Sequence, residues 1–343
     1  SRTNWESLFT TSSFRTASCS CKVSQCLVML GGDIAIEGYD MSKYNSLNEA
    51  IHECFGQDIS IAKSTRMSGG DINSMTRLTL SNGGNVLLKT NSYDNIDFFR
   101  TEVIGLTAIK ASNTIATPKL YGYGSDSDKR IAFLIMEEIH TTRAIGGAMS
   151  DLGYAFAKMH LADTAKITVD GKCITDKKYG FITDNYIGAT KQINTPKDSW
   201  IDFFRECRLE PQIKMAEHGM GNGLIKKSLA LLDRLDSIMI EPDKPSLLHG
   251  DMWGGNHLIR DDGVPVLIDP ATYVGHAEAD IAMTEMFSPF PRDFYKAYYE
   301  INPMVSDYSD RRDIYNLYHY LNHYNLFGGG YLSSAGHVIS RYV

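Results

Sequence analysis

The side chains best suited to chemistry lie in residues 247–256, which read Leu-Leu-His-Gly-Asp-Met-Trp-Gly-Gly-Asn. Asp251 precedes Asn256 by five residues, and Asp269 closes the apolar run that follows. A carboxylate beside a substrate hydroxyl can orient it and accept its proton late in phosphoryl transfer, which suits Asp251. Amide and carboxylate oxygens are hard ligands for Mg²⁺, which suits Asn256 and Asp269. The alternative is a polar turn between buried strands in which Asp251 caps a backbone amide.

Upstream segments contain the groups that a nucleotide needs. The loop 68–74 contains Gly69 and Gly70, which let backbone amides approach phosphates, although it lacks the Lys-Ser/Thr pair of a P-loop. Lys89 ends an apolar strand, and Glu102 opens the next helix, as the paired lysine and glutamate of protein kinases do. Taken singly, these are an ordinary turn and two solvated charges. Their order along the chain favours a nucleotide site.

Residues 135–139 would form a hinge between two lobes. The extended backbone at Glu137 and Ile139 would hold the adenine edge, and Met136 would close the back of that pocket. Plain core packing is the alternative for Met136.

Two features argue against a protein kinase. Gly250 stands before Asp251, where kinases regulated through an activation loop carry an arginine that receives a phosphate. The chain between Asp269 and the helix expected near Glu278 is too short for a long activation loop. A small-molecule kinase is therefore the better interpretation.

The elements that would position these residues fall into two groups. Before Glu138 we expect a small antiparallel sheet with one inserted helix, in which Asn82-Gly83-Gly84 forms a hairpin turn. After Glu138 the pattern is mainly helical, with Ser150 or Asp151 capping the first helix. The expected helices are 44–55, 98–110, 150–160, 200–218, 224–238 and most of 279–343; the expected strands are 58–64, 76–80, 85–89, 120–124, 131–135, 246–249, 258–259 and 264–268.

These elements predict an α+β, bilobal, protein-kinase-like fold. Residues 41–138 would be the nucleotide-binding N-lobe and residues 139–343 the catalytic and acceptor-binding C-lobe. Residues 1–40, rich in Ser, Thr and Cys, read as a tail that permits a transit peptide, an expression leftover or an incorrectly assigned start. A cytoplasmic protein is expected, with organelle targeting by this tail as the alternative.

Composition excludes several classes of protein. The 343 residues include 34 Lys and Arg against 41 Asp and Glu, a net charge of −7, which disfavours general nucleic-acid binding. No apolar run approaches the roughly 18–20 residues that cross a bilayer, so no membrane partner is expected. Isolated cysteines suit a reducing compartment. The cluster Cys19, Cys21 and Cys26 lacks a fourth metal ligand nearby.

From about Leu47 to its end, the chain resembles the fructosamine kinase (ketosamine-3-kinase) family, within a group similar to aminoglycoside phosphotransferases and choline kinases. The most specific stretches are residues 266–273, 278–285 and 318–331. The others are residues 68–73, 98–102, 184–190, 203–212 and 247–256.

The resemblance implies ATP- and Mg²⁺-dependent phosphorylation of the 3-hydroxyl of a ketosamine, a glycation-repair activity. Asp251 matches the family's catalytic base, and Asn256 and Asp269 match its metal ligands. The predicted nucleotide contacts are Gly69, Gly70, Asn73, Lys89, Glu102, Met136, Glu137 and Ile139.

The acceptor site is less specifically marked. Trp253 would be a wall for the sugar or part of the core. His319, Asn322 and Asn325 recur on one helical face, and would bind sugar hydroxyls or form a satisfied polar seam. The remaining candidates are Phe204, Arg205 and Glu210, which would line the acceptor cleft or orient their own helix, and Asp280, which would buttress the catalytic loop.

Two other functions stay open from the sequence. One is a kinase for another small hydroxyl acceptor, such as an aminoglycoside or an amino alcohol; the other is a non-catalytic nucleotide-binding module. Many eukaryotic members of the family carry a cysteine in the Gly-rich loop that links two chains, and residues 70–73 here contain none. The oligomeric state, monomer or weak dimer, is therefore left open.

Overall fold

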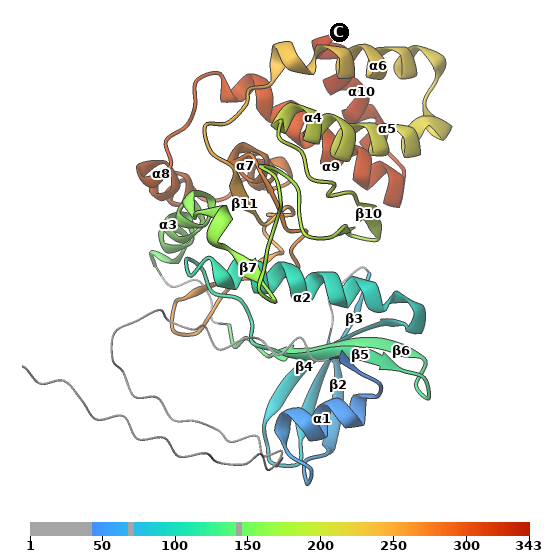
Figure 1. Ribbon diagram of the computed structural model, residues 1–343, viewed down its shortest axis with the longest axis vertical. Helices are drawn as coiled ribbons and strands as arrows, with labels where there is room; N and C mark the ends of the chain where they lie inside the picture. The colour runs from blue at the N-terminus through green and yellow to red at the C-terminus, as the bar shows by residue number, and fades with distance from the viewer. Residues whose placement is uncertain (1–42, 68–71, 142–145) are drawn as a thin grey trace, which may run out of the picture. The chain divides into compact units, whose positions relative to one another are not determined.

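The computed structural model describes residues 43–67, 72–141 and 146–343. A six-stranded sheet occupies the N-terminal part of the chain, in the order β1-β5-β6-β4-β3-β2 (Figure 1). Neighbouring strands are antiparallel except β1 and β5. The strands are β1 (Lys43–Tyr44), β2 (Ile61–Met67), β3 (Ser74–Leu80), β4 (Asn85–Ser92), β5 (Leu120–Asp126) and β6 (Ile131–Glu137).

The turn between β3 and β4 is the one that the sequence predicts. Gly83 has φ +86°, which a residue without a side chain adopts at no steric cost. The Leu80 amide donates to the Gly84 carbonyl at 2.8 Å, and the Asn82 side-chain oxygen accepts from the Gly84 amide at 2.9 Å. This turn fixes the register that places Lys89 opposite Met75 of β3.

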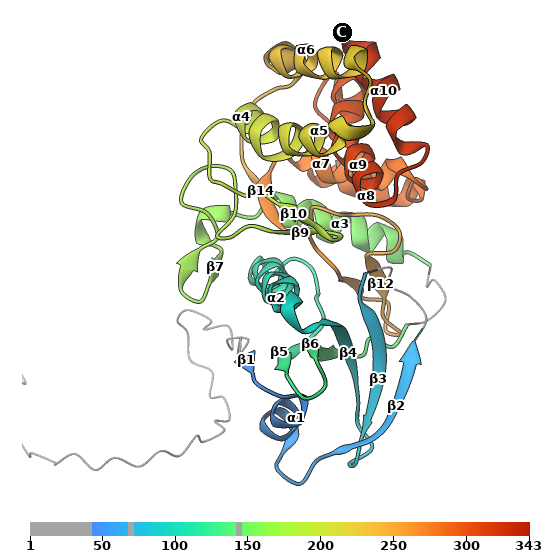
Figure 2. The same cartoon turned by 90° about the vertical axis from the view of Figure 1, so that its right-hand side faces the viewer.

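Two helices cover opposite faces of the sheet. The helix α1 (Leu47–Phe55) packs on the face that buries Phe133 and Ile135, whereas α2 (Ile96–Ala111) packs on the face that buries Leu134 and Met136. Successive residues of β6 thus serve the two faces in turn, as the pleat requires. The helix α2 lies between the sheet and the helical part of the chain (Figure 2).

The C-terminal part is mainly helical, as expected. Its helices are α3 (Ala148–Leu161), α4 (Trp200–Phe204), α5 (Glu210–Ala216), α6 (Asn222–Ile238), α7 (Ala277–Met286), α8 (Arg292–Ile301), α9 (Tyr308–Phe327) and α10 (Tyr331–Tyr342). Its strand pairs are β7 (Thr168–Val169) with β8 (Lys172–Cys173), β9 (Asn185–Ile187) with β10 (Thr190–Gln192), β11 (Ser246–Leu248) with β14 (Tyr273–Gly275), and β12 (His257–Ile259) with β13 (Pro265–Leu267).

One local prediction is refined and another is wrong. The helix expected over residues 200–218 is present, but it contains a π-helical turn at Arg205–Leu209, within which Arg208 is fully buried. One extra residue in a turn hardly disturbs an apolar pattern, so periodicity does not reveal it. The helix α3 begins at Ala148 after Gly147, so Ser150 and Asp151 lie in its first turn and do not cap it.

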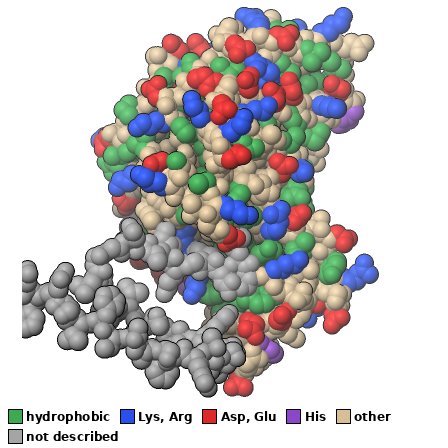
Figure 3. Space-filling model, viewed as in Figure 1, with side chains coloured by type: hydrophobic (Ala, Val, Ile, Leu, Met, Phe, Trp, Pro, Cys, Tyr) green, Lys and Arg blue, Asp and Glu red, His purple; other side chains and the backbone are tan. Residues whose placement is uncertain are grey.

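Among the described residues, no helix combines the length and the apolar character needed to cross a bilayer. On the face seen in Figure 3, acidic and basic side chains are interspersed over the helical part. The predicted tail, residues 1–40, lies outside the described residues, so the expected compartment stays a prediction.

The close approach of α3 and α8 depends on Gly153. A Cβ at Gly153 would overlap the carbonyl oxygen of Phe294 and lie 3.1 Å from the Ala297 side chain. Overpacking of this kind costs about 1–3 kcal/mol. We therefore expect Gly153→Ala to lower the free energy of unfolding by about that amount, although alanine is the better helix former.

The matched control is Gly336→Ala in α10, where a Cβ would lie 3.6 Å from Leu224, an ordinary contact distance. Urea unfolding should show Gly336→Ala to be neutral or stabilising. Equal effects of the two substitutions would contradict the close helix crossing.

Candidate active site

Lys89 joins two carboxylates that come from distant segments. Its Nζ donates to the two carboxylate oxygens of Glu102 at 2.8 and 2.9 Å, and to Oδ1 of Asp269 at 2.5 Å. The strand β4 supplies Lys89, α2 supplies Glu102, and Asp269 follows β13. The Lys89 side chain is 3% exposed, whereas that of Asp269 is 46% exposed. Three residues from three separate motifs thus meet at one point. Asp269 is the member of this group that solvent can reach.

Burial and pairing together set the charges of this group. Burial would lower the pKa of Lys89, but Asp269 and Glu102 raise it above its usual value, so the ammonium stays charged. Burial opposes ionisation of Asp269, yet the Lys89 ammonium holds the pKa of Asp269 below its ordinary value. Burial raises the pKa of Glu102, and the nearby Asp269 charge adds to this effect. Asp269 is therefore the carboxylate that stays ionised most readily.

Asp251 and Asn256 lie at opposite ends of one tight turn. The Asn256 Nδ2 donates to the Asp251 backbone oxygen at 2.8 Å and to its carboxylate Oδ2 at 3.0 Å. Burial raises the pKa of Asp251 to about 7, against which only the Asn256 hydrogen bond acts. A carboxylate with a pKa near 7 is a stronger base than an ordinary aspartate and is matched to proton transfer at neutral pH.

His249, which the sequence analysis did not single out, links the backbone at Asp251 to the backbone next to Asp269. Its Nε2 donates to the Ile268 carbonyl at 2.9 Å, and its Nδ1 accepts from the Asp251 amide at 3.3 Å. Because Nδ1 accepts an amide hydrogen it carries no proton, so the ring is neutral with its proton on Nε2, and burial lowers the pKa of His249 accordingly. The signal that marks it is its place two residues before Asp251 in an otherwise apolar strand.

Asp280 holds the backbone of the same turn, where the sequence analysis expected support. Its carboxylate accepts the His249 amide at 2.7 Å and the Gly250 amide at 2.8 Å. His160 lies 3.2 Å away through Nε2 and is itself hydrogen-bonded to Tyr298 at 2.7 Å. Asp280 is 1% exposed, so these donors replace the water that a buried carboxylate loses.

Two residues of the site have left-handed backbone conformations. Gly250 has φ +83°, and a Cβ there would overlap the Ala271 carbonyl oxygen, so no larger residue fits beside Asp251. Asp269 has φ +53°, which is strained for a residue with a side chain. Such strain persists where surrounding contacts enforce it, here the Lys89 ion pair.

The other predicted nucleotide residues are placed differently. Met136 is 3% exposed and packs in the core between α2 and the sheet, in agreement with the core alternative. The Glu137 carboxylate accepts the Lys119 amide at 2.9 Å, and Ile139 is part-buried after β6. Asn73 accepts from Asn91 Nδ2 at 2.8 Å.

The two predicted loop glycines, Gly69 and Gly70, lie outside the described residues.

Among the predicted acceptor residues, Phe204 and Arg205 contact neighbouring helices. Phe204 is 1% exposed and packs against Trp200 and Tyr315. The Arg205 guanidinium donates to Asp202, Asp236 and the Leu232 carbonyl, all on α4 and α6. Both residues fix helices to one another, in line with the alternative that they orient their helix. Glu210 is exposed at the start of α5.

Trp253 does not belong to the core. Its side chain is 43% exposed, and its ring covers Gly255, where a Cβ would overlap it. The Trp253 amide also donates to the Asp251 carbonyl at 3.2 Å. An exposed indole fixed two residues from Asp251 fits a wall for a polyhydroxylated ligand.

The polar face of α9 packs against α5. Gln212 donates to Asn322 at 3.2 Å, and Asn325 Nδ2 donates to the Gln212 side-chain oxygen at 2.7 Å. This is the polar seam that the sequence analysis gave as an alternative. It is incompletely satisfied, because His319 Nδ1 and Asn325 Oδ1 are buried without a hydrogen-bond partner among the described residues.

Sequence reasoning also missed a second buried polar cluster, which lies against Tyr273. Arg208, 0% exposed, donates to the Ile193 carbonyl at 2.5 Å and to Asn194 at 2.8 Å, and its guanidinium lies 3.9 Å from the Tyr273 ring centroid. Tyr318 donates to Gln192 at 2.8 Å. Nothing in a single sequence distinguishes these polar residues from surface ones.

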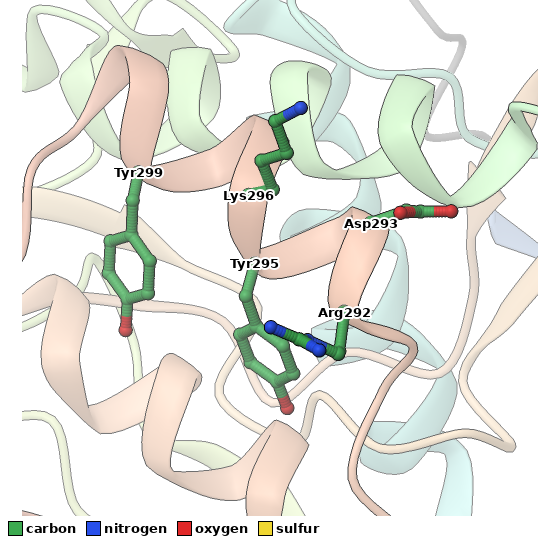
Figure 4. A pocket seen from close by; sticks show the side chains of 5 residues that line it. All are labelled: Arg292, Asp293, Tyr295, Lys296 and Tyr299. Atoms are coloured by element: carbon green, nitrogen blue, oxygen red, sulfur yellow. The ribbon is translucent and has the colours of Figure 1, made fainter.

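The two hollows outlined on the described surface lie elsewhere. One of about 590 Å³ follows α8 and is lined by Arg292, Asp293, Tyr295, Lys296 and Tyr299 (Figure 4). A second, of about 370 Å³, lies between the C-terminal end of α8 and the start of α7. Neither includes Lys89, Asp251 or Asp269, so cavity size does not identify the chemically capable group.

The donor set fits a magnesium ion carried by a nucleotide. The Asn256 amide group gives its nitrogen to Asp251, so its oxygen remains for a cation, and Asp269 keeps one oxygen outside its bond to Lys89. Within the described ranges, no group of three or more His, Cys, Asp or Glu could hold a metal. Mg²⁺ commonly takes one or two protein oxygens and completes its shell with phosphate and water, which suits this sparse set.

Comparisons with known proteins identify the family of this chain. The model of the family described as fructosamine kinase matches residues 43–343. A probable ketoamine kinase of Synechocystis is 34% identical over 299 residues, 87% of this chain and 96% of its own. The chloroplastic protein-ribulosamine 3-kinase of Arabidopsis thaliana is 38% identical over 293 residues, 84% of this chain and 85% of its own.

Solved structures give the same result for the fold. A provisionally assigned fructosamine-3-kinase from Haemophilus somnus has a TM-score of 0.75 and 28% identity, covering 89% of this chain and 99% of its own. A type I macrolide 2′-phosphotransferase, at 14% identity and a TM-score of 0.55 over 87% of this chain and 95% of its own, shares the fold alone. The α+β, bilobal, protein-kinase-like fold expected from the sequence is confirmed.

The raised pKa of Asp251 predicts a stability effect of its removal. The unfolded chain loses this proton near its ordinary pKa of 3.8, whereas the folded chain keeps it until about 7. The folded state binds more protons between these values, so the wild type loses stability as pH rises from about 4 to 7. We expect Asp251→Asn to be more stable than the wild type at pH 8, by an amount on the order of 1 kcal/mol, with the difference vanishing near pH 4.

Thermal unfolding of both proteins across this pH range checks the prediction. Asp128→Asn, at an exposed turn, is the control and should show no such pH-dependent gain. A less stable Asp251→Asn at pH 8 would mean that the carboxylate serves the fold.

Proposed function

This chain belongs to the fructosamine kinase family, and we propose that its Lys89, Asp251, Asn256 and Asp269 carry out ATP-dependent phosphorylation of the 3-hydroxyl of a ketosamine. Membership of this family makes the chain an ATP-dependent phosphotransferase that acts on ketosamines. The residue roles below are proposed from the geometry. The observation that carries them is the convergence of Glu102 and Asp269 on the Lys89 ammonium.

Lys89 binds the α- and β-phosphates of ATP, and Glu102 holds Lys89 in place. Two hydrogen bonds from one ammonium to Glu102 fix the direction of the lysine side chain, so little conformational entropy remains to be lost on binding. Asn256 and Asp269 would hold the magnesium ion, which when bound offsets the charge that develops on the phosphate oxygens. Asp269 would offer the cation the carboxylate oxygen that does not accept from Lys89.

Asp251 orients the sugar hydroxyl and receives its proton. As the oxygen–phosphorus bond to the acceptor forms and the bond between the β- and γ-phosphates breaks, the hydroxyl proton passes to the Asp251 carboxylate. The hydrogen bond from Asn256 turns one carboxylate oxygen toward the amide and leaves the other for the acceptor. Burial raises the basicity that this step uses.

The acceptor lies against the exposed Trp253 ring, which supports the apolar face of the sugar beside Asp251. The net charge of −7 favours an acceptor that carries an amine. The partner is a small-molecule or protein-bound ketosamine.

An acceptor panel tests the proposal. ADP release under Mg-ATP should depend on a fructosyl- or ribulosyl-amine and should fall at least about a thousandfold in Asp251→Asn, since the proton acceptor is lost. Nuclear magnetic resonance of the product should locate the phosphate on the sugar 3-oxygen. Robust turnover only with an aminoglycoside or an amino alcohol would contradict the acceptor, and calorimetry without Mg-ATP binding would contradict a kinase altogether.

The acid limb of the pH profile tests the role of Asp251 separately. A base must be deprotonated to act, so kcat/KM for the ketosamine should fall about tenfold per pH unit below the pKa of the free enzyme's carboxylate, about 7. The rate should level off above that pH. A profile that is flat from pH 5 to 8 would contradict a base with this environment.

A further inference from the structure

We propose that the hairpin β9–β10, residues 185–192, is a positioning element that keeps Glu102 and Asp269 on fixed sides of Lys89. The inference rests on the proposed function only for its kinetic readout. No residue of the hairpin bonds to Lys89, Glu102 or Asp269 among the described residues. It acts through the two segments that carry the carboxylates, α2 and the chain that follows Asp269.

The first contact of the hairpin is with α2. The rings of Tyr186 and Phe98 lie with their centroids 4.0 Å apart and are inclined by 39°. Phe98 precedes Glu102 by four residues, so the two side chains share one face of the helix. Gly105 continues this face one turn further. The face of α2 that presents Glu102 to Lys89 is therefore the face that the hairpin contacts.

The second contact is with the chain that follows Asp269. The Asn185 side-chain nitrogen donates to the Thr272 carbonyl at 2.8 Å, and the Gln192 nitrogen donates to the Ala271 carbonyl at 3.0 Å. Gln192 also donates to Asn185 at 2.8 Å, which joins the two strands of the hairpin. Both side chains are at most 3% exposed, so no water competes for these carbonyls.

The third contact joins α2 directly to the chain that follows Asp269. A Cβ at Gly105 would lie 2.9 Å from Thr272 Oγ1 and 3.4 Å from the Pro270 ring, so α2 and this chain segment touch where only glycine fits. The connections run from Lys89 through Glu102, Phe98, Tyr186, Asn185 and Thr272 to Asp269, and back to Lys89.

Because these contacts form a closed series, a displacement of α2 would disturb at least one of them. In protein kinases, the position of the corresponding helix is a control point, because it makes or breaks the lysine–glutamate pair. Here the hairpin stabilises the paired position. The lysine site is thus assembled without a phosphate-dependent activation loop, for which the chain has no room.

Tyr186→Ala tests the proposal, with Tyr186→Phe as the conservative variant. Removing the ring should raise the Kd and KM for Mg-ATP about 3- to 10-fold, the range that an aromatic pair is worth, and should change the acceptor KM less than 2-fold. Tyr186→Phe keeps the ring and should stay within 2-fold of the wild type. Phe98→Ala should have the same effect as Tyr186→Ala, and the double variant should lose no more than either one.

Tyr121→Ala is the matched control, because Tyr121 and Phe55 form a ring pair with centroids 4.8 Å apart on the other face of the sheet. It should lower the melting temperature without changing the Mg-ATP Kd. Hydrogen exchange supplies a second readout that needs neither nucleotide nor acceptor: amides of α2 should exchange faster in Tyr186→Ala and unchanged in Tyr121→Ala.

Tyr186→Ala with an unchanged Mg-ATP Kd and unchanged exchange in α2 would overturn the proposal, even if its melting temperature falls. If Tyr186→Ala does not fold, Tyr186→Leu replaces it with the same expected direction. A wild type that phosphorylates no ketosamine would overturn the proposed acceptor alone, since the exchange of α2 and the binding of Mg-ATP still decide the role of the hairpin.

Discussion

A single buried ammonium is the constraint around which the rest of the molecule is arranged. Lys89 is 3% exposed, and an unpaired charge at that depth would be very unfavourable, so the fold must bring carboxylates to it. Glu102 and Asp269 do so from segments that are 13 and 180 residues away along the chain. The sheet, α2 and the segment after β13 cannot move independently without leaving a charge unpaired.

The same reasoning explains why polar residues fill the interior around the catalytic turn. Asp280 is buried and satisfied by backbone amides, and His249 is buried as a neutral ring between two backbone groups. These contacts bind main chain, so they fix the course of the turn itself. Hydrogen bonds offset the free energy that is lost when these polar groups are buried. As a result, the turn presents Asp251 and Asn256 in one orientation.

Function places demands on the site that stability alone would oppose. Asp251 is kept in surroundings that disfavour its charge, and Asp269 is held in a left-handed conformation. Both features cost folding free energy, and both belong to the group that would bind the nucleotide and the acceptor. The surrounding packing, including the close approach at Gly250 and Gly105, compensates for this cost.

Motif spacing predicted Asp251, Asn256, Asp269, Lys89 and Glu102 as one group, and the structure brings Lys89, Glu102 and Asp269 into contact. This worked because each residue is tied to a local pattern, a strand end or a helix start. The acceptor side was harder: Phe204 and Arg205 have the right neighbours in sequence but point into helix contacts, and a single sequence does not say which face of a helix is turned inward.

The two-part α+β fold, the hairpin at Asn82–Gly84 and the candidate phosphotransfer residues could be predicted from the amino-acid sequence, because periodicity, turn chemistry and motif spacing are local properties of the chain. The contacts of His249, Asn185 and Tyr186, the π-helical turn at Arg208 and the exposure of Trp253 became visible only in the folded chain. Those depend on which distant backbone groups and rings come together, and contacts between residues tens to hundreds of positions apart leave no local periodic signal.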